Sequence, residues 1–506
     1  MLTPVATDSS PAPSRVHDLR RAALKHSGRQ AKLAELVAEA MQKDIAALGW
    51  PVGSLLGSEA QLMERYRISR ATLREAIRQL ERNGVASMRR GAGGGLIVRQ
   101  PAKDSAALAL ATYLELTDVS FAELFEAREL IECLIVSQAA EQLSDSDIGR
   151  ARQLIDLLRH TPPCSFNEEL QLHGQVRELI CQVAANPAIS LIYVALCYVT
   201  INGRTPQRAH VRARLEQAFS TGRQLKLELL ECIVAGDAQR AQDNVRDSLR
   251  QLRELIVELS GSLQKGPTSD MSSLQLAPDF AIRKVYEKTA HRLAVVIARS
   301  IANSGLRAGA RLGAEPDLQA LHQVSRAVLR EAVRTLELHA IVRSRRGQGG
   351  GLIVETPDPS YTIKLLLNYL RHNQLPRHYF YSVWKTLQLT AAGLTAQRLD
   401  SQGRARLQQL QAATAAARLS NSRELDLCIA ELSGNRALAL FSHVFGAMTE
   451  HDPLPEALAD KLRDSQTQRI QALLARDPSL ARRSMLRYFQ LLEGAFDATA
   501  PGGSAG

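Results

Sequence analysis

Residues 69–101 read SRATLREAIRQLERNGVASMRRGAGGGLIVRQP, and residues 325–357 read SRAVLREAVRTLELHAIVRSRRGQGGGLIVETP. The two stretches share 20 of 33 residues at a fixed offset of 256 positions, which chance does not produce. Similarity at a fixed offset indicates a repeated structural unit. The sequence therefore predicts an internal duplication, in which each half opens with a compact basic block and continues as a long helical region.

The first copy of the repeat has the pattern of a capped basic helix. Ser69 is a good N-cap, and the residues after it form an apolar face at helical spacing: Leu73, Ala76, Ile77 and Leu80. The opposite face carries Arg70, Arg74 and Arg78. A short helix from Ser58-Glu59 to about Tyr66 and a tight turn precede it. This order predicts a helix-turn-helix, whose second helix enters the major groove of DNA.

DNA contacts are predicted at the start of each capped helix, because a recognition helix enters the groove with its N-terminal end first. Arginine can donate two hydrogen bonds to guanine. The predicted contacts are Ser69, Arg70, Thr72 and Arg74 in the first copy, and Ser325, Arg326 and Arg330 in the second. Arg78 is interpreted as a phosphate contact or a solvated charge, and Glu75 and Glu331 as partners of a neighbouring arginine.

A solvated arginine stripe without a function is the competing interpretation. The second copy keeps all three arginines, as Arg326, Arg330 and Arg334, although nearby surface positions differ. That retention within one chain favours the DNA-binding interpretation over the solvated stripe.

A glycine-rich turn with paired arginines follows each capped helix. Glycines permit a tight turn and a close approach of the backbone to phosphate, so we interpret the turn as a wing between two short strands. Its predicted DNA contacts are Arg90, Gly91 and Gly93, and Arg346, Gly347 and Gly349. No Gly-Lys-Ser/Thr follows, which excludes a nucleotide-binding loop. Strand signals are confined to the pieces after Gly84 and around 91–98, and to their counterparts near Val342 and 352–354.

Composition and charge agree with a nucleic-acid partner. The chain of 506 residues is too long for one core, and its net charge of +11 points to a polyanion. No apolar run is long enough to cross a bilayer, and the N-terminus has no apolar core of the signal-peptide type. The six cysteines form no CxxC pair. We therefore expect a cytoplasmic protein with free thiols and no membrane partner.

The repeat and the local composition predict seven segments. A Ser-, Gly- and Pro-containing linker separates the halves, and the amphipathic pattern of each half is helical. Landmarks such as Asn186-Pro187 and Asn435, or Ala-Gly-Asp at 235–237 and Ala-Arg-Asp at 475–477, also recur. The segments are a disordered tail (1–28), a winged helix-turn-helix (29–101), a helical effector-binding domain (102–261), the linker (262–278), a second winged helix-turn-helix (279–357), a second helical effector-binding domain (358–496) and a C-terminal tail (497–506).

These residues resemble the GntR family of bacterial regulators, specifically its FadR-like branch. The family pattern has a Ser-Glu start to the second helix, a Ser-Arg-x-x-Leu-Arg-Glu-Ala recognition helix and a Gly-rich wing. The matches are Ser58-Glu59, 69–76 and 91–98 in the first copy, and Ala314-Glu315, 325–332 and 347–354 in the second. The resemblance implies a mainly α fold with two winged helix-turn-helix domains, each followed by an all-helical, FCD-like effector-binding bundle.

One position departs from the family pattern in both copies. An arginine that usually follows the Ser-Glu pair touches DNA in the family, whereas this chain has Ala60 and Pro316 there. One DNA contact that the resemblance implies is therefore missing twice.

The resemblance also implies where a ligand would lie. Many such domains hold a metal with one Asp and three His and bind a carboxylate there. Those positions map to His173, Arg177, Lys226 and Ser248 in the first half, and to Ser422, Asp426, Gln466 and Tyr488 in the second. Neither set suits a divalent metal, so we expect no metal and no other cofactor.

Basic residues stand at most of the implied positions of the first half. Buried cations need a partner, so the predicted effector is an anion, such as a carboxylate, a phosphate or an acyl-CoA, bound by Arg128, His173, Arg177, Lys226 and Ser248. The competing interpretation places some of these residues on the surface. The second half has Trp384 and Gln388 where the first has Arg128 and Glu132, and it would bind a more apolar ligand or nothing.

These observations predict an effector-responsive DNA-binding transcription regulator, with repression favoured over activation. The chain has no nucleophile–base arrangement, and its halves leave too little room for a fused aminotransferase-like domain, so we expect no enzyme. The alternative is a sequence-tolerant architectural DNA-binding protein whose effector lobes have decayed. The partner is a double-stranded operator, read either by one chain as an intramolecular pseudodimer or by a homodimer with four modules. Because Thr72 is replaced by Val328, the operator could be an imperfect palindrome.

Overall fold

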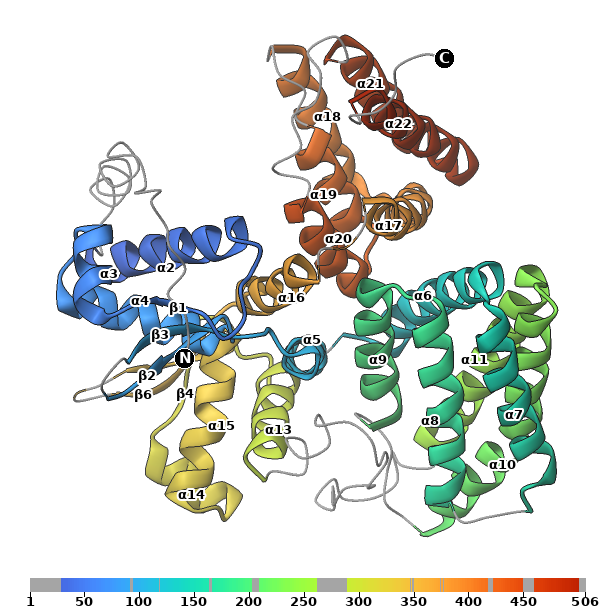
Figure 1. The fold of residues 1–506 in the computed structure, drawn as a ribbon, viewed down its shortest axis with the longest axis horizontal. Coiled ribbons are helices and arrows are strands. Elements are labelled where there is room, and N and C mark those ends of the chain that lie inside the picture. Colours follow the sequence, from blue (N-terminus) through green and yellow to red (C-terminus); the bar gives the residue numbers. More distant parts are fainter. Residues whose placement is uncertain are drawn as a thin grey trace. The chain divides into compact units, whose positions relative to one another are not determined.

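The structure is a computed structural model of a mainly helical chain with two small sheets (Figure 1). It describes residues 29–91, 94–117, 119–162, 166–202, 209–261, 289–345, 347, 350–373, 375, 377–416, 422–448 and 459–499. The chain divides into two compact units, Met1–Ala109 with Lys364–Gln374, and Leu110–Ile363 with Leu375–Gly506. The predicted tail 1–28 and linker 262–278 lie outside the described residues, as does part of the tail 497–506.

The first head, residues 29–98, contains three helices and a three-stranded antiparallel sheet. Its elements are α2 (Arg29–Ala47), β1 (Leu55–Gly57), α3 (Glu59–Tyr66), α4 (Arg70–Arg82), β2 (Ala86–Arg89) and β3 (Gly95–Val98). The sheet order is β1-β3-β2. The predictions for α3, α4, β2 and β3 are confirmed. Strand β1 was not predicted, because three residues with an irregular register against β3 carry no alternating pattern.

The core of the first head brings its helices together over the sheet. The apolar face predicted for α4 is buried, and Leu73 and Leu80 are fully covered. They pack in one cluster with Met41 and Ile45 of α2 and with Leu96 of β3. This packing holds the second face of α4 on the outside of the head.

The second head, residues 289–354, repeats this arrangement. Its elements are α13 (Thr289–Asn303), β4 (Arg311–Gly313), α14 (Glu315–His322), α15 (Arg326–Leu338), β5 (Val342–Arg345) and β6 (Gly351–Val354). The sheet order is β4-β6-β5, and Arg345 pairs with Gly351 as Arg89 pairs with Gly95 in the first head. Strand β4, like β1, was not predicted.

A helix follows each head: α5 (Lys103–Leu116) and α16 (Ser360–His372). The C-terminal end of α5 packs on the second head, where Leu116 joins the apolar core and Glu115 lies 3.4 Å from His291. The later part of α16 packs on the first head, where Lys364 pairs with Glu35 at 2.8 Å. Asn368 donates to the carbonyl oxygen of Asn83 at 3.4 Å. Each of these helices thus contacts the head that does not precede it.

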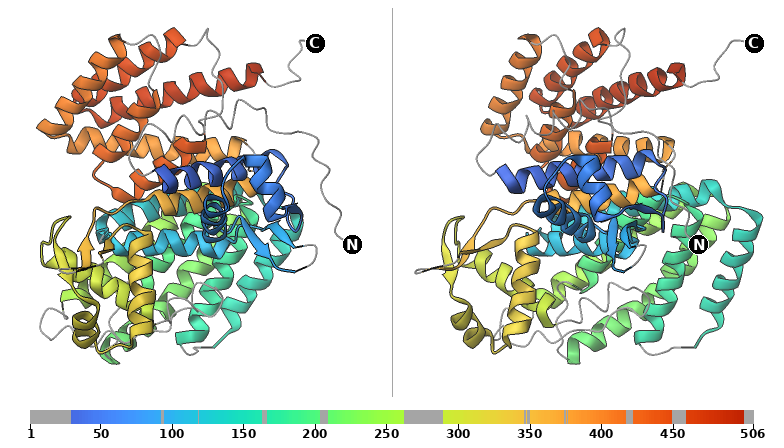
Figure 2. Two further views of the ribbon diagram at one scale, coloured as in Figure 1. Left: turned by 90° about the vertical axis from the view of Figure 1, so that its left-hand side faces the viewer. Right: turned by 60° about the vertical axis from the view of Figure 1, so that its left-hand side comes forward.

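The remaining helices form two bundles (Figure 2). The first lobe consists of α6 (Phe121–Gln142), α7 (Asp145–His160), α8 (Phe166–Val183), α9 (Pro187–Asn202), α10 (Ala209–Val234) and α11 (Ala238–Gly261). The second lobe consists of α17 (Arg377–Arg398), α18 (Ser401–Ala416), α19 (Ser422–Leu432), α20 (Arg436–Met448), α21 (Ala459–Leu474) and α22 (Pro478–Thr499). The fourth and sixth helices of both lobes begin at the landmarks seen in the sequence.

Those landmarks are helix caps. Asn186 accepts hydrogen bonds from the backbone of Ala188 and Ile189, and Asn435 accepts one from Leu438. Each asparagine thereby satisfies N–H groups that a helix start leaves without partners. Asp237 and Asp477, the last residues of the recurring tripeptides, cap α11 and α22 in the same way.

Candidate DNA-binding and ligand-binding sites

The recognition helix of the first head begins at a capped, solvent-exposed end. The Ser69 hydroxyl accepts a hydrogen bond from the backbone N–H of Thr72, which confirms the predicted cap. The Arg70 side chain is 63% exposed and the Arg74 side chain 57%, and both contact Glu59, at 3.0 and 3.2 Å. The predicted outward face of α4 therefore exists, and its arginines are tethered by a carboxylate from α3.

Two further residues of α4 bear on its predicted roles. Glu75 pairs with Arg78 at 2.9 Å and with Arg82 at 3.8 Å, as its interpretation as a structural partner required. Thr72 differs from expectation, because it is only 3% exposed and its hydroxyl lies 2.9 Å from that of Ser69. The structure gives Thr72 a place in the N-cap, turned away from a base edge, since the third residue of a capped helix faces back toward the cap.

The wing of the first head leaves its basic residues in solvent. Arg89, Arg90 and Gly91 are exposed at the turn between β2 and β3. A side chain at Gly94 would approach the carbonyl oxygen of Arg89 to 2.4 Å, so this turn closes only around a glycine. Gly93 lies outside the described residues.

The second head presents the same surface with a weaker tether. Ser325 caps α15 through the backbone N–H of Val328, and both Arg326 and Arg330 are exposed. Arg330 lies 3.6 Å from Glu315. Gly347 is exposed in the wing turn, whereas Arg346 and Gly349 lie outside the described residues.

Arg128 is the centre of a buried polar cluster in the first lobe. It is 7% exposed and pairs with Glu132 one helical turn later, which is also buried. Its Nη1 donates to the Thr200 hydroxyl at 2.7 Å. The sequence predicted that an effector supplies the partner of this cation. In the structure, Glu132 of the same helix supplies it.

Two of the other predicted effector residues lie around the same cluster. The charges of Arg177 and Lys226, together with that of Arg128, lower the pKa of the buried Cys197 thiol, although burial outweighs them and raises it. Burial also lowers the pKa of Lys226, and the field of Glu132 opposes that shift. Basic side chains from α6, α8 and α10 therefore gather near Cys197 of α9.

The other two predicted effector residues, His173 and Ser248, lie on α8 and α11. The imidazole Cε1 of His173 lies 3.4 Å from where a side chain at Gly222 would begin, so His173 faces α10. Ser248 is half-buried on α11. No hydrogen bond joins Ser248 to Arg128 or Lys226 among the described residues.

The second lobe buries a different cluster, centred on a residue that the sequence did not single out. Arg469 of α21 is 1% exposed, and its Nη1 donates to Asp426 of α19. Its guanidinium lies 3.8 Å from the ring centre of Tyr488, whose hydroxyl donates to Asp426 at 3.1 Å. Burial raises the pKa of Asp426, and the pairing with Arg469 opposes that shift. The side chain of Ser422, mapped to this site from sequence, lies outside the described part.

The signal for Arg469 was present but not decisive. It follows Leu462 and Gln466 on the buried face of α21, at helical spacing. A lone arginine on an otherwise buried face is as compatible with a surface position as with an internal ion pair, so spacing alone could not assign it.

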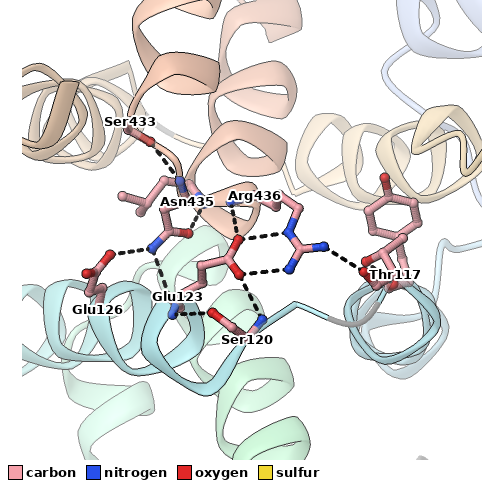
Figure 3. Close-up of polar contacts among 9 residues, drawn as sticks. Thr117, Ser120, Glu123, Glu126, Ser433, Asn435 and Arg436 are labelled. Atoms are coloured by element: carbon pink, nitrogen blue, oxygen red, sulfur yellow. Dashed lines mark hydrogen bonds and ion pairs between the residues drawn. The ribbon is translucent and has the colours of Figure 1, made fainter. Parts of the chain in front are cut away.

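The two lobes meet where α6 and α20 begin (Figure 3). Arg436 donates through Nε and Nη2 to the two carboxylate oxygens of Glu123, at 2.8 Å each, and through Nη1 to the carbonyl oxygen of Thr117 at 2.9 Å. Asn435 donates to the carbonyl oxygen of Glu123 at 2.9 Å and to Glu126 at 3.0 Å. The cap of α20 and the start of α6 therefore share one hydrogen-bond network.

This network changes the acidity of its carboxylate. Burial by itself would raise the pKa of Glu123. Hydrogen bonds from Arg436 and Ser120 outweigh burial and lower the pKa to about 2. Glu123 is therefore held as a carboxylate, which also completes the capping box of α6 with Ser120.

A second set of contacts joins the lobes with the roles exchanged. Asn186, the cap of α9, lies 3.5 Å from the carbonyl oxygen of Tyr379 on α17, and Tyr379 stands 256 residues after Glu123. Gln138 donates to the Ser382 hydroxyl at 3.2 Å. In both directions, a capping asparagine of the fourth helix contacts the first helix of the other lobe. Contacts of this reciprocal kind are typical of a two-fold interface.

Metal-ligand groups and membrane-spanning helices are both lacking among the residues that the structure describes. Among them, no three His, Cys, Asp or Glu side chains are grouped so that they could hold a metal ion. None of the described helices is both long and apolar enough to span a bilayer. No disulfide joins the described cysteines, which are Cys133, Cys181, Cys197, Cys232 and Cys428.

Comparison with protein families assigns most of the first half. Residues 33–95 match the model "Bacterial regulatory proteins, gntR family", and residues 123–251 match the FCD domain. The first half is therefore similar to a gntR-family helix-turn-helix domain followed by an FCD domain. The gntR match contains α3, α4 and Glu59, and the FCD match contains Glu123, Arg128 and Lys226.

Curated relatives resemble parts of the chain. The Exu regulon transcriptional regulator of Escherichia coli K12 is 32% identical over 126 residues, which are 25% of this chain and 48% of that protein. The putative HTH-type transcriptional regulator RmpR of Mycobacterium gastri is 23% identical over 222 residues, 43% of this chain and 78% of that protein. The chain thus spans about half the length of the Exu regulator. Among solved structures, Streptococcus agalactiae GntR is 19% identical, covers 40% of this chain and 99% of its own, and has a TM-score of 0.32.

Proposed function

We propose that this protein is a sequence-specific DNA-binding transcription regulator, acting as a repressor, whose operator affinity is modulated by a small anionic metabolite. The observation that carries the proposal is the capped helix α4, which buries Leu73 and Leu80 and turns Arg70 and Arg74 outward within the gntR-family match. The two relatives are named as transcriptional regulators, which supports it. A regulator of this kind binds without converting its ligand, and it acts in the cytoplasm beside its DNA.

The arginines of α4 are available to DNA at small cost. Their ion pairs with Glu59 are largely solvent-exposed, and such pairs are worth only about 0–1 kcal/mol. Phosphate or a guanine edge can therefore replace Glu59 as the partner of Arg70. Before DNA binds, Glu59 keeps both arginines near the exposed end of the helix.

The DNA-binding proposal is tested by selecting a bound sequence from a random DNA library with the full chain. Its affinity is then measured by fluorescence anisotropy at fixed salt, beside a shuffled duplex of equal length. Arg70→Ala and Arg326→Ala are each expected to cost about 1–3 kcal/mol and to relax specificity at one half-site. Arg82→Ala, at the other end of α4, is the matched control and should have little effect. Unchanged affinity in both recognition-helix variants would refute the assignment.

The sequence-tolerant architectural protein remains the second candidate. The relatives do not favour it, but it is tested because Ala60 and Pro316 each replace a DNA-contacting arginine that the family resemblance implies. The same anisotropy experiment separates the two candidates. Equal affinity for selected and shuffled duplexes supports the architectural protein and contradicts a specific regulator.

A single chain supplies both DNA-binding modules in this proposal, as a duplicated regulator fused into one intramolecular pseudodimer. Support comes from the repeated block in the sequence and from the reciprocal contacts of Asn186 with Tyr379 and of Asn435 with Glu123. The exchange of α5 and α16 between the heads also supports it. Such contacts occupy within one chain the surface that a homodimer would otherwise bury between two copies.

The oligomeric state tests the pseudodimer. Multi-angle light scattering of the purified chain should give about its formula mass of 55.5 kDa, both alone and at the concentration used for DNA binding. A mass of twice that value at all concentrations favours the homodimer with four modules and refutes the monomeric pseudodimer.

We propose the first lobe as the site of the metabolite, and the basic side chains around Cys197 support this proposal. Because Arg128 already has Glu132, Lys226 is the better residue to test. Anionic metabolites are screened by thermal shift of the full chain, and a hit is retested on Lys226→Met and Arg128→Ala. Binding should weaken in Lys226→Met. A hit unaffected by either change would remove the cationic site.

A further inference from the structure

A short connection, residues 117–120, joins the helix that packs on the second head to the first helix of the first lobe. On one side of it, Leu116 at the end of α5 belongs to the apolar core of the second head. On the other side, Ser120 caps α6. Only this connection therefore separates the core of the second head from the start of α6.

Arg436, at the start of α20 in the second lobe, holds the beginning of this connection (Figure 3). Its Nη1 donates to the carbonyl oxygen of Thr117 at 2.9 Å, while its Nε and Nη2 donate to Glu123 of α6 at 2.8 Å each. The end of a helix leaves its last carbonyl groups without partners, and its negative pole favours a cation. One guanidinium group thus ties the end of α5 to the starts of α6 and α20.

The end of α5 is in turn held on the second head by buried contacts. Glu115 lies 3.4 Å from His291 of α13, and both side chains are at most 6% exposed. The ring of Tyr113 lies 6.0 Å from that of His339, the residue that ends α15. The Thr117 hydroxyl donates to the carbonyl oxygen of Tyr113 at 2.8 Å. A series of contacts therefore leads from the connection to α13 and α15.

The other half of the chain lacks the residues for a second clamp of this kind. Pro187 stands at the start of α9 where Arg436 stands at the start of α20, and Tyr379 stands where α6 has Glu123. Proline has no side-chain donor, so the ion pair has no counterpart at the start of α9. The compact units agree with this difference, because the second head shares a unit with both lobes and the first head does not.

We propose that Arg436 is a positioning residue that fixes the second head to the lobes through Thr117, and that the first head has no equivalent clamp. Movements of α6 or α20 reach the second head through this clamp, so the lobes control the two heads unequally. This inference goes beyond the proposed function, which treats both heads alike as DNA-binding modules. Its consequence for DNA rests on that function, whereas the hold on the second head does not.

Hydrogen–deuterium exchange of the full chain without DNA tests the clamp. Arg436→Met should lower the protection of residues 110–116 and of α13 about 3- to 10-fold, because the end of α5 loses its hold. The helices α2 and α4 of the first head should keep their protection. Arg436→Lys keeps the charge but loses the planar fork that reaches two partners, so its effect should be intermediate.

Arg398→Met is the matched control. Arg398 donates to Glu126 and to the carbonyl oxygen of Ser433 at the same junction of the lobes, and these contacts join α17 to α6 without α5. The control should therefore leave the protection of residues 110–116 and of α13 unchanged. Circular dichroism establishes that each variant is folded, and Arg436→Lys keeps the test decisive if Arg436→Met does not fold.

A double-variant cycle tests the consequence for DNA, with affinity for the selected duplex measured by fluorescence anisotropy. In the Arg70→Ala background the second head still contributes fully, so adding Arg436→Met should weaken binding about 3- to 10-fold. In the Arg326→Ala background the contact of the second head is already impaired, so the further loss should be smaller.

The outcomes separate the clamp from the proposed function. Unchanged exchange in Arg436→Met, or the same loss of protection in Arg398→Met, would overturn the clamp. Equal further losses in the two DNA backgrounds would overturn its action on the second head. A chain that selects no DNA sequence would contradict the proposed function and would leave the exchange results as the test of the clamp.

Discussion

At the positions where the first lobe buries Arg128 and Glu132, the second lobe buries Trp384 and Gln388, 256 residues later. The ion pair of the first lobe lies within one helix, α6. The ion pair of the second lobe joins two helices, α21 and α19, through Arg469 and Asp426. Both lobes thus contain a buried ion pair, but they build it from different elements.

The difference has a consequence for what each lobe can bind. Arg128 uses its donors on Glu132 and Thr200, and its surroundings hold further basic residues such as Lys226. Arg469 engages Asp426 through Nη1, and its Nε and Nη2 have no hydrogen-bond partner among the described residues. The first lobe therefore offers excess positive charge, whereas the second offers a directional pair of donors. Such a difference predicts that substitutions at the two ion pairs behave unequally.

The largest effect is expected for Arg469→Met. It leaves the Asp426 carboxylate almost fully buried with Tyr488 as its remaining partner. Breaking a buried pair in this way costs about 3–5 kcal/mol. Urea unfolding measures the loss, and hydrogen–deuterium exchange should locate it in α17–α22. The double variant Arg469→Met/Asp426→Leu should recover most of the stability, and a double variant as unstable as the single one would contradict this reading of the pair.

A smaller loss is expected for Arg128→Met. Glu132 then keeps the favourable field of Lys226, so we expect a loss of about 1–3 kcal/mol, below that of Arg469→Met. The same urea titration compares the two variants directly. If Arg128→Met proves the more damaging change, the basic residues of the first lobe do not compensate Glu132 and the contrast between the lobes fails.

The sequence predicted the heads better than the lobes for a physical reason. Caps, apolar spacing and glycine turns are local, so Ser69, Leu73 and the turn at Gly91 assigned α4 and the wing from short stretches. The strands β1 and β4 were not predicted, because a three-residue strand is defined by its pairing with a partner strand, here β3 or β6, and not by a pattern in its own sequence. The sequence predicted a base contact for Thr72, but the structure buries this residue in the N-cap. Exposure at the start of a helix depends on the cap geometry, which spacing alone does not give.

The sites in the lobes depend on contacts between distant residues. Arg128 needs no ligand as a partner because it pairs with Glu132. The second lobe has a buried polar cluster because of Arg469. When the two lobes are aligned on their recurring tripeptides, the first lobe has Leu229 at the position of Arg469. Spacing predicted that such residues face inward but could not say which inward residues meet. The reciprocal contacts of Asn186 and Asn435 were likewise visible only as recurring landmarks.

The junction of the lobes gives a prediction with a defined pH window. The pKa of Glu123 is lowered from its ordinary 4.5 to about 2 by the network around Arg436. A carboxylate with a depressed folded-state pKa stabilises the fold above pH 4.5, and this contribution is lost as pH falls from 4.5 toward 2. Arg436→Met should therefore cost about 1–2 kcal/mol at pH 7, and its difference from wild type should shrink through that window.

Urea midpoints at pH 7, 5, 4 and 3 measure this difference. Arg240→Met, which removes a surface arginine 4.0 Å from Asp237, is the matched control and should cost at most a few tenths of a kcal/mol at every pH. A constant difference between Arg436→Met and wild type across the window would mean that Glu123 does not titrate as the network requires.

The smallest effect concerns a turn at which the lobes differ by one residue. Gly236 and Arg476 both have positive φ, at 71° and 56°, just before the caps of α11 and α22. Glycine adopts this conformation freely, whereas other residues are strained there by roughly 1 kcal/mol. Arg476 is exposed, so Arg476→Gly should remove the strain and lose little packing. Part of the gain is offset by the greater freedom of glycine in the unfolded chain, which leaves a stabilisation of about 0.5 kcal/mol.

The reverse change, Gly236→Arg, should lower the stability of the first lobe by about 1 kcal/mol. Hydrogen exchange of α22 and α11 reports the two changes separately, and a stabilising Gly236→Arg would show that the equivalence of the two turns does not extend to their energetics.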